Sequence, residues 1–198
     1  MKVHQTNIDH PLFLHISKFM EMDINDFPHI LAAFNIIKVP KKNLLMAADR
    51  LCEAHFFVIK GCLNMYYISE NGHKQTVQFA IENWWLTDYL AFGAQKKSEF
   101  YIQAVEPTTV LRIDFKGQEE LLARYPYLEK YFRTIYQIAY GASLMRVKYQ
   151  YGLSKEENYF HFAERFPDFV QRVPQYLIAS YLGLTPEYVS EIRKKHLS

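Results

Sequence analysis

Apolar and polar residues alternate with a period of two through much of residues 34–114, and this pattern predicts strands. The strand-like runs are FNIIKVP, HFFVIKG, EFYIQAVEP, TTVLRID and the two halves of CLNMYYISENGHKQTVQFA. The Asn71-Gly72 pair inside the longest run predicts a hairpin with a two-residue type I′ turn. Short strands at this spacing, separated by turn residues, are typical of a jelly roll or a small barrel. Two helices are expected before the strands, over residues 11–20 and 24–34.

At Phe115 the apolar period changes from that of a strand to that of a helix. The run FKGQEELLARY predicts one helix, and the segment from Pro126 onward predicts a much longer one. Its apolar residues recur in the three-four alternation that forms the seam of a coiled coil. The seam consists of Leu128, Tyr131 or Phe132, Ile135, Ile138 or Ala139, Ala142, Met145 and Tyr149. It can pack on the chain's own roll, but its length and its small alanines favour packing against the same helix of a second copy.

The last part of the chain predicts further helices. Ser154 and Glu157 have the spacing of a capping box that starts one of them, and FPDFVQRVP is expected to be a loop. Two apolar helical faces follow, made of Ile178, Ala179 and Leu182 and of Tyr188, Val189 and Ile192. Between them, Gly183 suits the left-handed residue that ends a helix, Thr185 suits an N-cap and Pro186 the first helical position. Two helices that cross in this way form a helix-turn-helix.

The outer face of the final helix is polar, with short side chains first and cations later. It consists of Glu187, Ser190, Glu191, Arg193 and Lys194. Helices that read DNA contact base edges with their N-terminal residues and phosphates with flanking cations. The alternative is an ordinary helical hairpin inside an α-helical core. The carboxylates of Glu187 and Glu191 are repelled by phosphate. They can contribute to recognition only by accepting a hydrogen bond from the amino group of a cytosine.

Composition narrows the class of protein. The 198 residues are 49% hydrophobic and include fifteen Tyr and fifteen Phe, which is enough for one substantial core and a small second unit. Because the net charge is only +2, affinity for nucleic acid must come from a local patch. No apolar run approaches the roughly 20 residues of a membrane span, and the N-terminal stretch lacks the apolar segment of a signal peptide. We therefore expect a cytoplasmic protein without a membrane partner.

The sequence gives little support for a metal site or an enzyme active site. Cys52 and Cys62 match no closely spaced metal pattern, and the eight histidines show neither H-x-H nor H-E-x-x-H spacing. A G-x-S-x-G elbow and a P-loop are both missing. We therefore expect no enzyme and no cofactor. A cupin-like metal enzyme is the least favoured alternative, because it needs clustered His and carboxylate ligands.

A β-roll, a long helix and a C-terminal helix-turn-helix, in that order, resemble the Crp/Fnr family of bacterial transcription regulators. HFFVIKGCLNMYYISENGHKQTVQF is similar to the family's central roll hairpins, and VPQYLIASYLGLTPEYVSEIRKK is similar to its DNA-binding element in the form seen in Bacteroidetes members. The resemblance implies an α+β fold with a cyclic-nucleotide-binding-like sensor roll over 1–115, a linker and dimerisation helix over 116–150 and a DNA-binding helix-turn-helix over 151–198. It also implies a homodimer on a palindromic operator in double-stranded DNA, with RNA polymerase as a partner if the protein is an activator.

By position, the resemblance assigns DNA contacts to Pro186, Glu187, Ser190, Glu191, Arg193, Lys194 and Lys195. The first four fall where the family's base-contacting residues lie, and the three cations are left to meet phosphates. The family often places arginine at the position of Glu191, so this chain lacks a guanine reader. Either the operator differs or DNA binding is weakened. A second hypothesis follows, in which a dimeric regulator-like protein has lost operator binding and acts through protein partners.

The sensor positions depart further from the family. Members that bind cyclic nucleotides hold the ribose with a Gly-Glu pair and the cyclic phosphate with an Arg followed by Ser or Thr. Those positions are here occupied by Thr87 and Asp88 and by Ser98 and Glu99. The missing arginine would supply paired charge-assisted donors to the phosphate. We expect no binding of cyclic AMP in the usual way, and a small-molecule effector of unknown identity; Trp84 and Trp85 either wall an apolar pocket or pack in the core.

Overall fold

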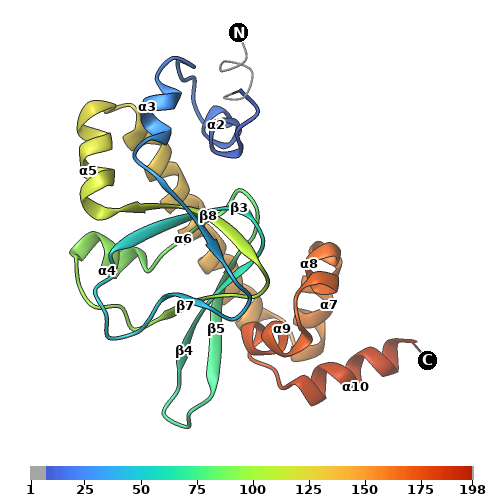
Figure 1. Cartoon of the computed structure of the whole chain (residues 1–198). Coiled ribbons are helices and arrows are strands. Elements are labelled where there is room, and N and C mark those ends of the chain that lie inside the picture. Colours follow the sequence, from blue (N-terminus) through green and yellow to red (C-terminus); the bar gives the residue numbers. More distant parts are fainter. Residues whose placement is uncertain (1–7, 198) are drawn as a thin grey trace. The chain divides into compact units, whose positions relative to one another are not determined.

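The computed structural model describes residues 8–197, which form two compact units. The first runs to Met65 and continues over Phe79–Gln137, and we call it the roll unit. The second combines Tyr66–Gln78 with the chain from Ile138 onward, and we call it the C-terminal unit (Figure 1). Strands β4 (Leu63–Ile68) and β5 (Lys74–Ala80) and helix α6 (Leu128–Gly152) contain residues of both units.

Two four-stranded sheets with the strand orders β1-β8-β3-β6 and β2-β7-β4-β5 confirm the predicted roll (Figure 1). Besides β4 and β5, its strands are β1 (Asn35–Val39), β2 (Leu44–Met46), β3 (Ala54–Lys60), β6 (Trp85–Leu86), β7 (Tyr101–Ala104) and β8 (Thr108–Asp114). In the antiparallel pair of β3 and β8, Phe57 lies opposite Leu111, and Phe57 also pairs with Trp85 of β6. This register directs all three side chains into one core.

The turn from β3 to β4 depends on Gly61. Its φ of +109° is rarely adopted by residues with a side chain. A Cβ at this position would lie 2.7 Å from the backbone Cα of Thr108, which is closer than real Cβ contacts allow. Glycine is therefore required both for the backbone conformation and for the close approach of the neighbouring chain.

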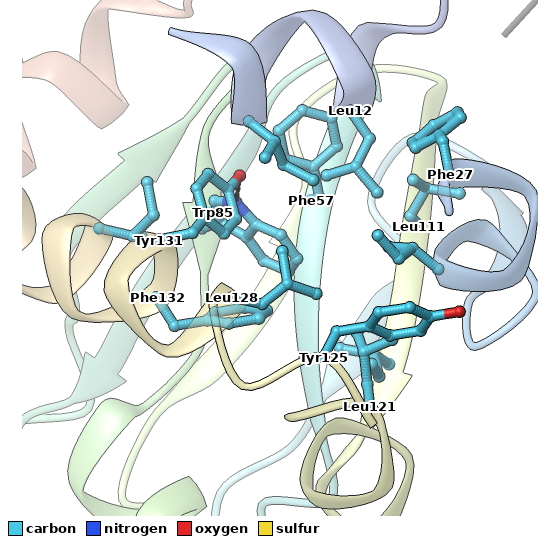
Figure 2. Packing of buried hydrophobic residues seen from close by; sticks show 14 residues of the cluster. Leu12, Phe27, Phe57, Trp85, Leu111, Leu121, Tyr125, Leu128, Tyr131 and Phe132 are labelled. Carbon is cyan, nitrogen blue, oxygen red and sulfur yellow. Dashed lines mark hydrogen bonds between the residues drawn. The ribbon is translucent and has the colours of Figure 1, made fainter. Parts of the chain in front are cut away.

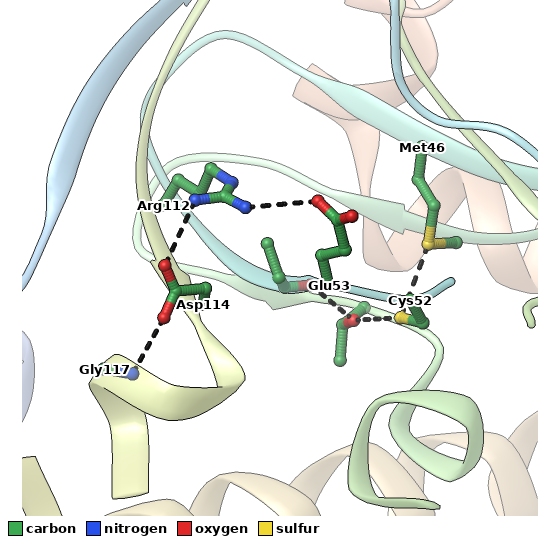
Figure 3. Close-up of polar contacts among 8 residues, drawn as sticks. Met46, Cys52, Glu53, Arg112, Asp114 and Gly117 are labelled. Carbon is green, nitrogen blue, oxygen red and sulfur yellow. Dashed lines mark hydrogen bonds and ion pairs between the residues drawn. The ribbon is translucent and has the colours of Figure 1, made fainter. Parts of the chain in front are cut away.

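Among the residues that the structure describes, four short helices and the first part of α6 complete the roll unit. They are α2 (Pro11–Ser17), α3 (Phe27–Leu31), α4 (Tyr89–Ala94) and α5 (Phe115–Arg124). Asp114 caps α5, because its Oδ1 accepts from the Gly117 amide at 2.8 Å, while Arg112 lies 3.6 Å from Asp114 and 3.7 Å from Glu53 (Figure 3). The cap fixes the start of α5 at the end of β8.

The core of the roll unit joins α2, α3, α5 and the first part of α6 to the first sheet (Figure 2). Its fully packed members are Leu12, Ile16, Phe27, Ile30, Phe57, Trp85, Leu111, Ile113, Leu121, Tyr125, Leu128, Tyr131, Phe132 and Ile135. Burying one such side chain contributes about 1.5–3 kcal/mol. The last four come from α6, so the first part of the predicted seam packs on the chain's own roll.

A chain of three buried polar groups crosses this core. The Trp85 indole Nε1 donates to the Tyr131 hydroxyl at 2.8 Å, and that hydroxyl lies 2.7 Å from Nδ1 of His15. Because an indole can only donate, the Tyr131 hydroxyl accepts from Trp85, and the same hydroxyl forms a second hydrogen bond with His15. The three groups tie α2, β6 and α6 together.

Two buried histidines predict that the protein loses stability in mild acid. Burial lowers the pKa of His55 to about 3, against the opposing effect of its hydrogen bond to the Gln118 amide oxygen, and burial together with the charge of Lys18 lowers the pKa of His15 to about 4. The unfolded chain therefore binds protons below pH 6.5 that the folded chain does not yet bind. Each histidine should cost about 2 kcal/mol of unfolding free energy at pH 5 relative to pH 7.

This expectation is checked by urea unfolding between pH 7 and pH 4.5. The His55→Gln variant should show a slope of unfolding free energy against pH that is shallower by about 1 kcal/mol per pH unit on average over this range, because one titrating group is gone. Parallel slopes for the variant and the wild type would contradict the assignment.

The C-terminal unit contains the rest of α6 and the helices α7 (Lys155–Arg165), α8 (Pro167–Arg172), α9 (Gln175–Leu182) and α10 (Pro186–Leu197). The capping box of Ser154 and Glu157 is confirmed by both of its hydrogen bonds. The loop expected over FPDFVQRVP is wrong, because α8 occupies most of it. Pro167 sits in its first turn, where the missing N–H costs nothing, and Phe169 packs edge-on against Phe162.

Within residues 8–197 no helix is both long and apolar enough to cross a membrane.

The hairpin between β4 and β5 has its turn at the predicted place but of another type. Ser69 pairs with His73 through the Ser69 amide at 2.9 Å, and the Gly72 amide donates to the Ser69 carbonyl at 2.8 Å. Gly72 has a φ of +77°, whereas Asn71 is not among the residues with positive φ. A type I′ turn needs positive φ at both central residues, so that prediction is wrong. The loop is a three-residue connection in which only glycine takes the left-handed conformation.

Candidate nucleic-acid interface and effector site

Helices α9 and α10, which we call the C-terminal helix pair, have the geometry expected from their sequence. Gly183 ends α9 with a φ of +71°, and the Thr185 hydroxyl accepts from the Tyr188 amide at 3.2 Å. The Leu184 amide donates to the Ala179 carbonyl at 2.8 Å and tightens the turn. Five of the six residues of the predicted apolar faces are buried, namely Ile178, Ala179, Leu182, Val189 and Ile192, and Tyr188 is partly buried.

The residues predicted to contact DNA share the outside of α10. Pro186, Glu187, Ser190, Glu191, Arg193, Lys194 and Lys195 are exposed. Their exposure follows from the burial of Val189 and Ile192, because these two residues turn the opposite face of α10 away from α9. The arrangement offers hydroxyl and carboxylate groups near the start of the helix and cations farther along it.

Gln175, at the start of α9, forms hydrogen bonds with three of these residues and was not found from the sequence. Its Nε2 donates to the Ser190 Oγ at 2.9 Å and to the Pro186 carbonyl at 3.2 Å, and its Oε1 accepts from Arg193 at 3.3 Å. One amide group thus ties the first turn of α9 to the outer face of α10. The only sign of this role in the sequence is that Gln175 is a polar residue at the beginning of an apolar helix.

The Glu191 carboxylate is paired with a cation of its own helix. Its Oε1 lies 2.9 Å from Nζ of Lys195, one turn later, and both side chains are exposed. The hydrogen bond and charge of Glu191 raise the pKa of Lys195. Glu191 therefore removes a cationic reader from the face and also partly neutralises a lysine that would meet phosphate.

The sensor positions are brought together in the roll unit, but they bind one another. Asp88 is the N-cap of α4, where its Oδ1 accepts from the Ala91 amide at 3.1 Å. Its other oxygen accepts from the Ser98 hydroxyl at 2.8 Å, and Ser98 is buried. Glu99 is exposed. The carboxylate and the hydroxyl that were candidates for holding an effector therefore satisfy each other.

The Thr87 hydroxyl also has its hydrogen-bond partners within the protein. Its hydroxyl donates to the Ala54 carbonyl at 2.8 Å and lies 3.3 Å from the Cys52 thiol, which also contacts the Met46 sulfur at 3.5 Å (Figure 3). Burial is the main cause that raises the pKa of Cys52, so the thiol is the form present at neutral pH. Both cysteines are fully buried, and neither forms a disulfide.

The residues at the sensor site do not fit a cyclic nucleotide in the family's way. No arginine stands at the phosphate position, and the polar groups of Thr87, Asp88 and Ser98 already have partners. Lys96 and Lys97 are exposed. Of the two tryptophans, Trp85 is in the core and Trp84 is about half exposed, so they do not wall a common pocket.

Comparisons with known proteins agree with this fold. Residues 36–125 match the sequence profile of the cyclic nucleotide-binding domain. FixK2 from Bradyrhizobium japonicum has a similar structure, with a TM-score of 0.69, 14% sequence identity and coverage of 82% of this chain and 83% of that chain. A protein from Eubacterium rectale assigned to the Crp/Fnr family of regulators gives a TM-score of 0.67, 14% identity and coverage of 88% and 83%. The global regulator CLP of Xanthomonas campestris gives 0.68, 11% identity and coverage of 88% and 92%.

Residues 36–125 therefore resemble a cyclic nucleotide-binding domain, and the chain has the fold of Crp/Fnr regulators. No curated protein matches the sequence. Both the domain and the fold agree with the family resemblance inferred from the sequence.

Proposed function

We propose that this protein is a transcription regulator of the Crp/Fnr type that binds a palindromic operator as a homodimer. The observation that carries the proposal is the exposed outer face of α10, which presents Ser190, Arg193 and Lys194 on a helix firmly seated on α9. Such a helix fits the major groove of DNA, where side chains near its start reach base edges. The regulators with similar folds add support.

The sensor of this regulator does not take cyclic AMP in the usual way. The Asp88–Ser98 hydrogen bond and the missing arginine support this part of the proposal. CLP is described as responsive to c-di-GMP, so a related fold serves a regulator with another effector.

The test is a selection from random double-stranded DNA with the full-length protein at low and at moderate salt. A two-fold symmetric motif with half-sites about one helical turn apart is the expected product. Its affinity should fall steeply with salt, because each neutralised phosphate releases counterions. Failure to enrich any motif at either salt would instead favour the alternative of a dimer that has lost operator binding and acts through protein partners.

Replacing Glu191 by arginine is expected to tighten binding to the selected operator when a guanine is placed opposite residue 191. A bidentate contact to guanine discriminates by about 1–3 kcal/mol, and the added cation should steepen the salt dependence by about one unit. Lys195 would also be released from its ion pair. The measurement is a salt titration of affinity for operators that differ at one base.

Glu164→Arg is the matched control, because it makes the same charge change on an exposed residue of α7. It should add no base preference. Equal behaviour of the two variants would mean that residue 191 does not face the groove.

A metal enzyme has no corresponding support. In the part of the chain that the structure describes, no three His, Cys, Asp or Glu side chains lie close enough together to hold a metal ion. The cupin-like alternative required such a cluster.

A further inference from the structure

The tip of the β4–β5 hairpin, residues 66–78, belongs to the C-terminal unit and contacts α9 there. β5 is the last strand of its sheet, so one of its edges has no partner strand. Such an edge exposes unpaired backbone groups unless something covers it. In this unit, helix α9 and a side chain of α6 provide the cover.

Ser180 of α9 takes the place of a partner strand along this edge. Its Oγ accepts from the Thr76 amide at 2.8 Å and donates to the Lys74 carbonyl at 3.0 Å. The Ser180 carbonyl accepts in addition from the Gln75 side chain. Three consecutive residues of the strand are thus joined to one residue of the helix.

Arg146 of α6 joins the same two elements from another side. Its Nη1 donates to the Val77 carbonyl at 2.5 Å, and its Nη2 donates to the Tyr181 carbonyl at 2.8 Å and lies 3.5 Å from the Thr76 carbonyl. The guanidinium also lies over the Tyr181 ring, with its carbon 4.3 Å from the centroid. A planar fork with several donors can reach both elements at once, which a lysine ammonium on a flexible stem cannot do equally well.

The position of the Arg146 charge adds to the effect. Tyr181 lies in the last turn of α9, where the carbonyl groups carry the negative end of the helix dipole. Hydrogen bonds from a charged donor are stronger than those between neutral groups. The contact therefore holds the end of α9 that leads directly into the turn before α10.

We propose that Arg146 and Ser180 lock the hairpin tip and the C-terminal helix pair into one body, so that Arg146 is a positioning residue for α10. The positioning of α10 on DNA rests on the proposed function. Since β4 and β5 continue into the roll unit, a shift of these strands would be passed to the helix pair through the hairpin as well as through α6.

The first arm of the test follows hydrogen exchange of the full-length protein by mass spectrometry. Arg146→Lys keeps the charge but loses the fork, and Ser180→Ala removes the bridging hydroxyl. Lys148→Met, on an exposed residue of the same helix, is the control. Both test variants should speed exchange in residues 66–78 and in α9 together, and the control should change neither. Faster exchange in the hairpin tip alone, or in neither segment, would overturn the lock.

The second arm measures affinity for the selected operator and for the same operator with one base pair inserted between its half-sites. A loss of folded protein would lower the affinities for both operators equally. A loss of positioning would lower the ratio of the affinity for the selected operator to the affinity for the operator with the insertion. Arg146→Lys should reduce the ratio about tenfold, the effect of losing one hydrogen bond from a charged group. An unchanged ratio with faster hairpin exchange would overturn the positioning role. If the wild type selects no operator, the proposed function fails, and the exchange arm still decides whether the lock exists.

Discussion

Replacing Trp85 by alanine is expected to destabilise the roll unit by about 3–5 kcal/mol, the usual cost of truncating a large aromatic side chain in a core. Trp85 is only 4% exposed, and its ring lies 4.4 Å from His55, 5.2 Å from Phe57 and 5.4 Å from Phe132 between centroids. The truncation also removes the donor to the Tyr131 hydroxyl. Since whole domains are stable by only about 5–15 kcal/mol, this loss leaves the fold marginal.

Trp84→Ala is a control of the same size at the neighbouring position. The Trp84 side chain is 48% exposed, so its truncation should cost much less. Each variant retains one tryptophan as a fluorescent probe, and unfolding in guanidinium chloride measures both. Equal destabilisation by the two substitutions would contradict the placement of Trp85 at the centre of the core.

The pattern of apolar residues predicted the longer elements because each follows a single period. The strands β1, β3, β5 and β8 and the helices α5 and α10 lie where the pattern placed them. The elements β6 and α4 were missed because two residues and six residues are too short to establish a period. Helix α8 was missed for a similar reason, since its proline and phenylalanines suggested a loop.

The sequence predicted where the candidate-site residues lie, but not which hydrogen bonds they form. Exposure on α10 follows from its apolar face, which the sequence displays directly. The hydrogen bonds of Asp88 with Ser98 and of Gln175 with Ser190 join residues of different elements, and the pattern within one element carries no information about them. The same holds for the contact of Ser180 with β5, which is separated from it by about a hundred residues of sequence.

The seam predicted along α6 proved to have two parts with different surroundings. Leu128, Tyr131, Phe132 and Ile135 pack into the roll core. Farther along, Tyr149 of the predicted seam packs on His161 of α7, with ring centroids 4.2 Å apart. Ile138 and Met145 of the predicted seam are exposed between these two parts. A second row of exposed apolar side chains there consists of Tyr140, Leu144, Val147 and Tyr151. Their three-four spacing suits a helix that pairs with a second copy.

Replacing Leu144 by glutamate is therefore expected to weaken the proposed homodimer by at least about 100-fold, because a two-fold axis at this row would bring two uncompensated carboxylates into one apolar interface. Sedimentation equilibrium of the full-length protein measures the dissociation constant. Operator affinity should fall with it, since a monomer reaches only one half-site. The secondary structure should be unchanged, because Leu144 is half exposed in the single chain.

Ala142→Glu decides which row forms the interface. Ala142 belongs to the seam predicted from the sequence, whereas at about 100° per residue it faces away from the row that contains Leu144. A dimer that tolerates glutamate at residue 142 but not at residue 144 pairs through the exposed row. The reverse result would assign the interface to the row that contains Ala142. If both variants stay dimeric, the second half of α6 is not the dimer helix, and the two α10 helices need another interface to hold them about one helical turn of DNA apart.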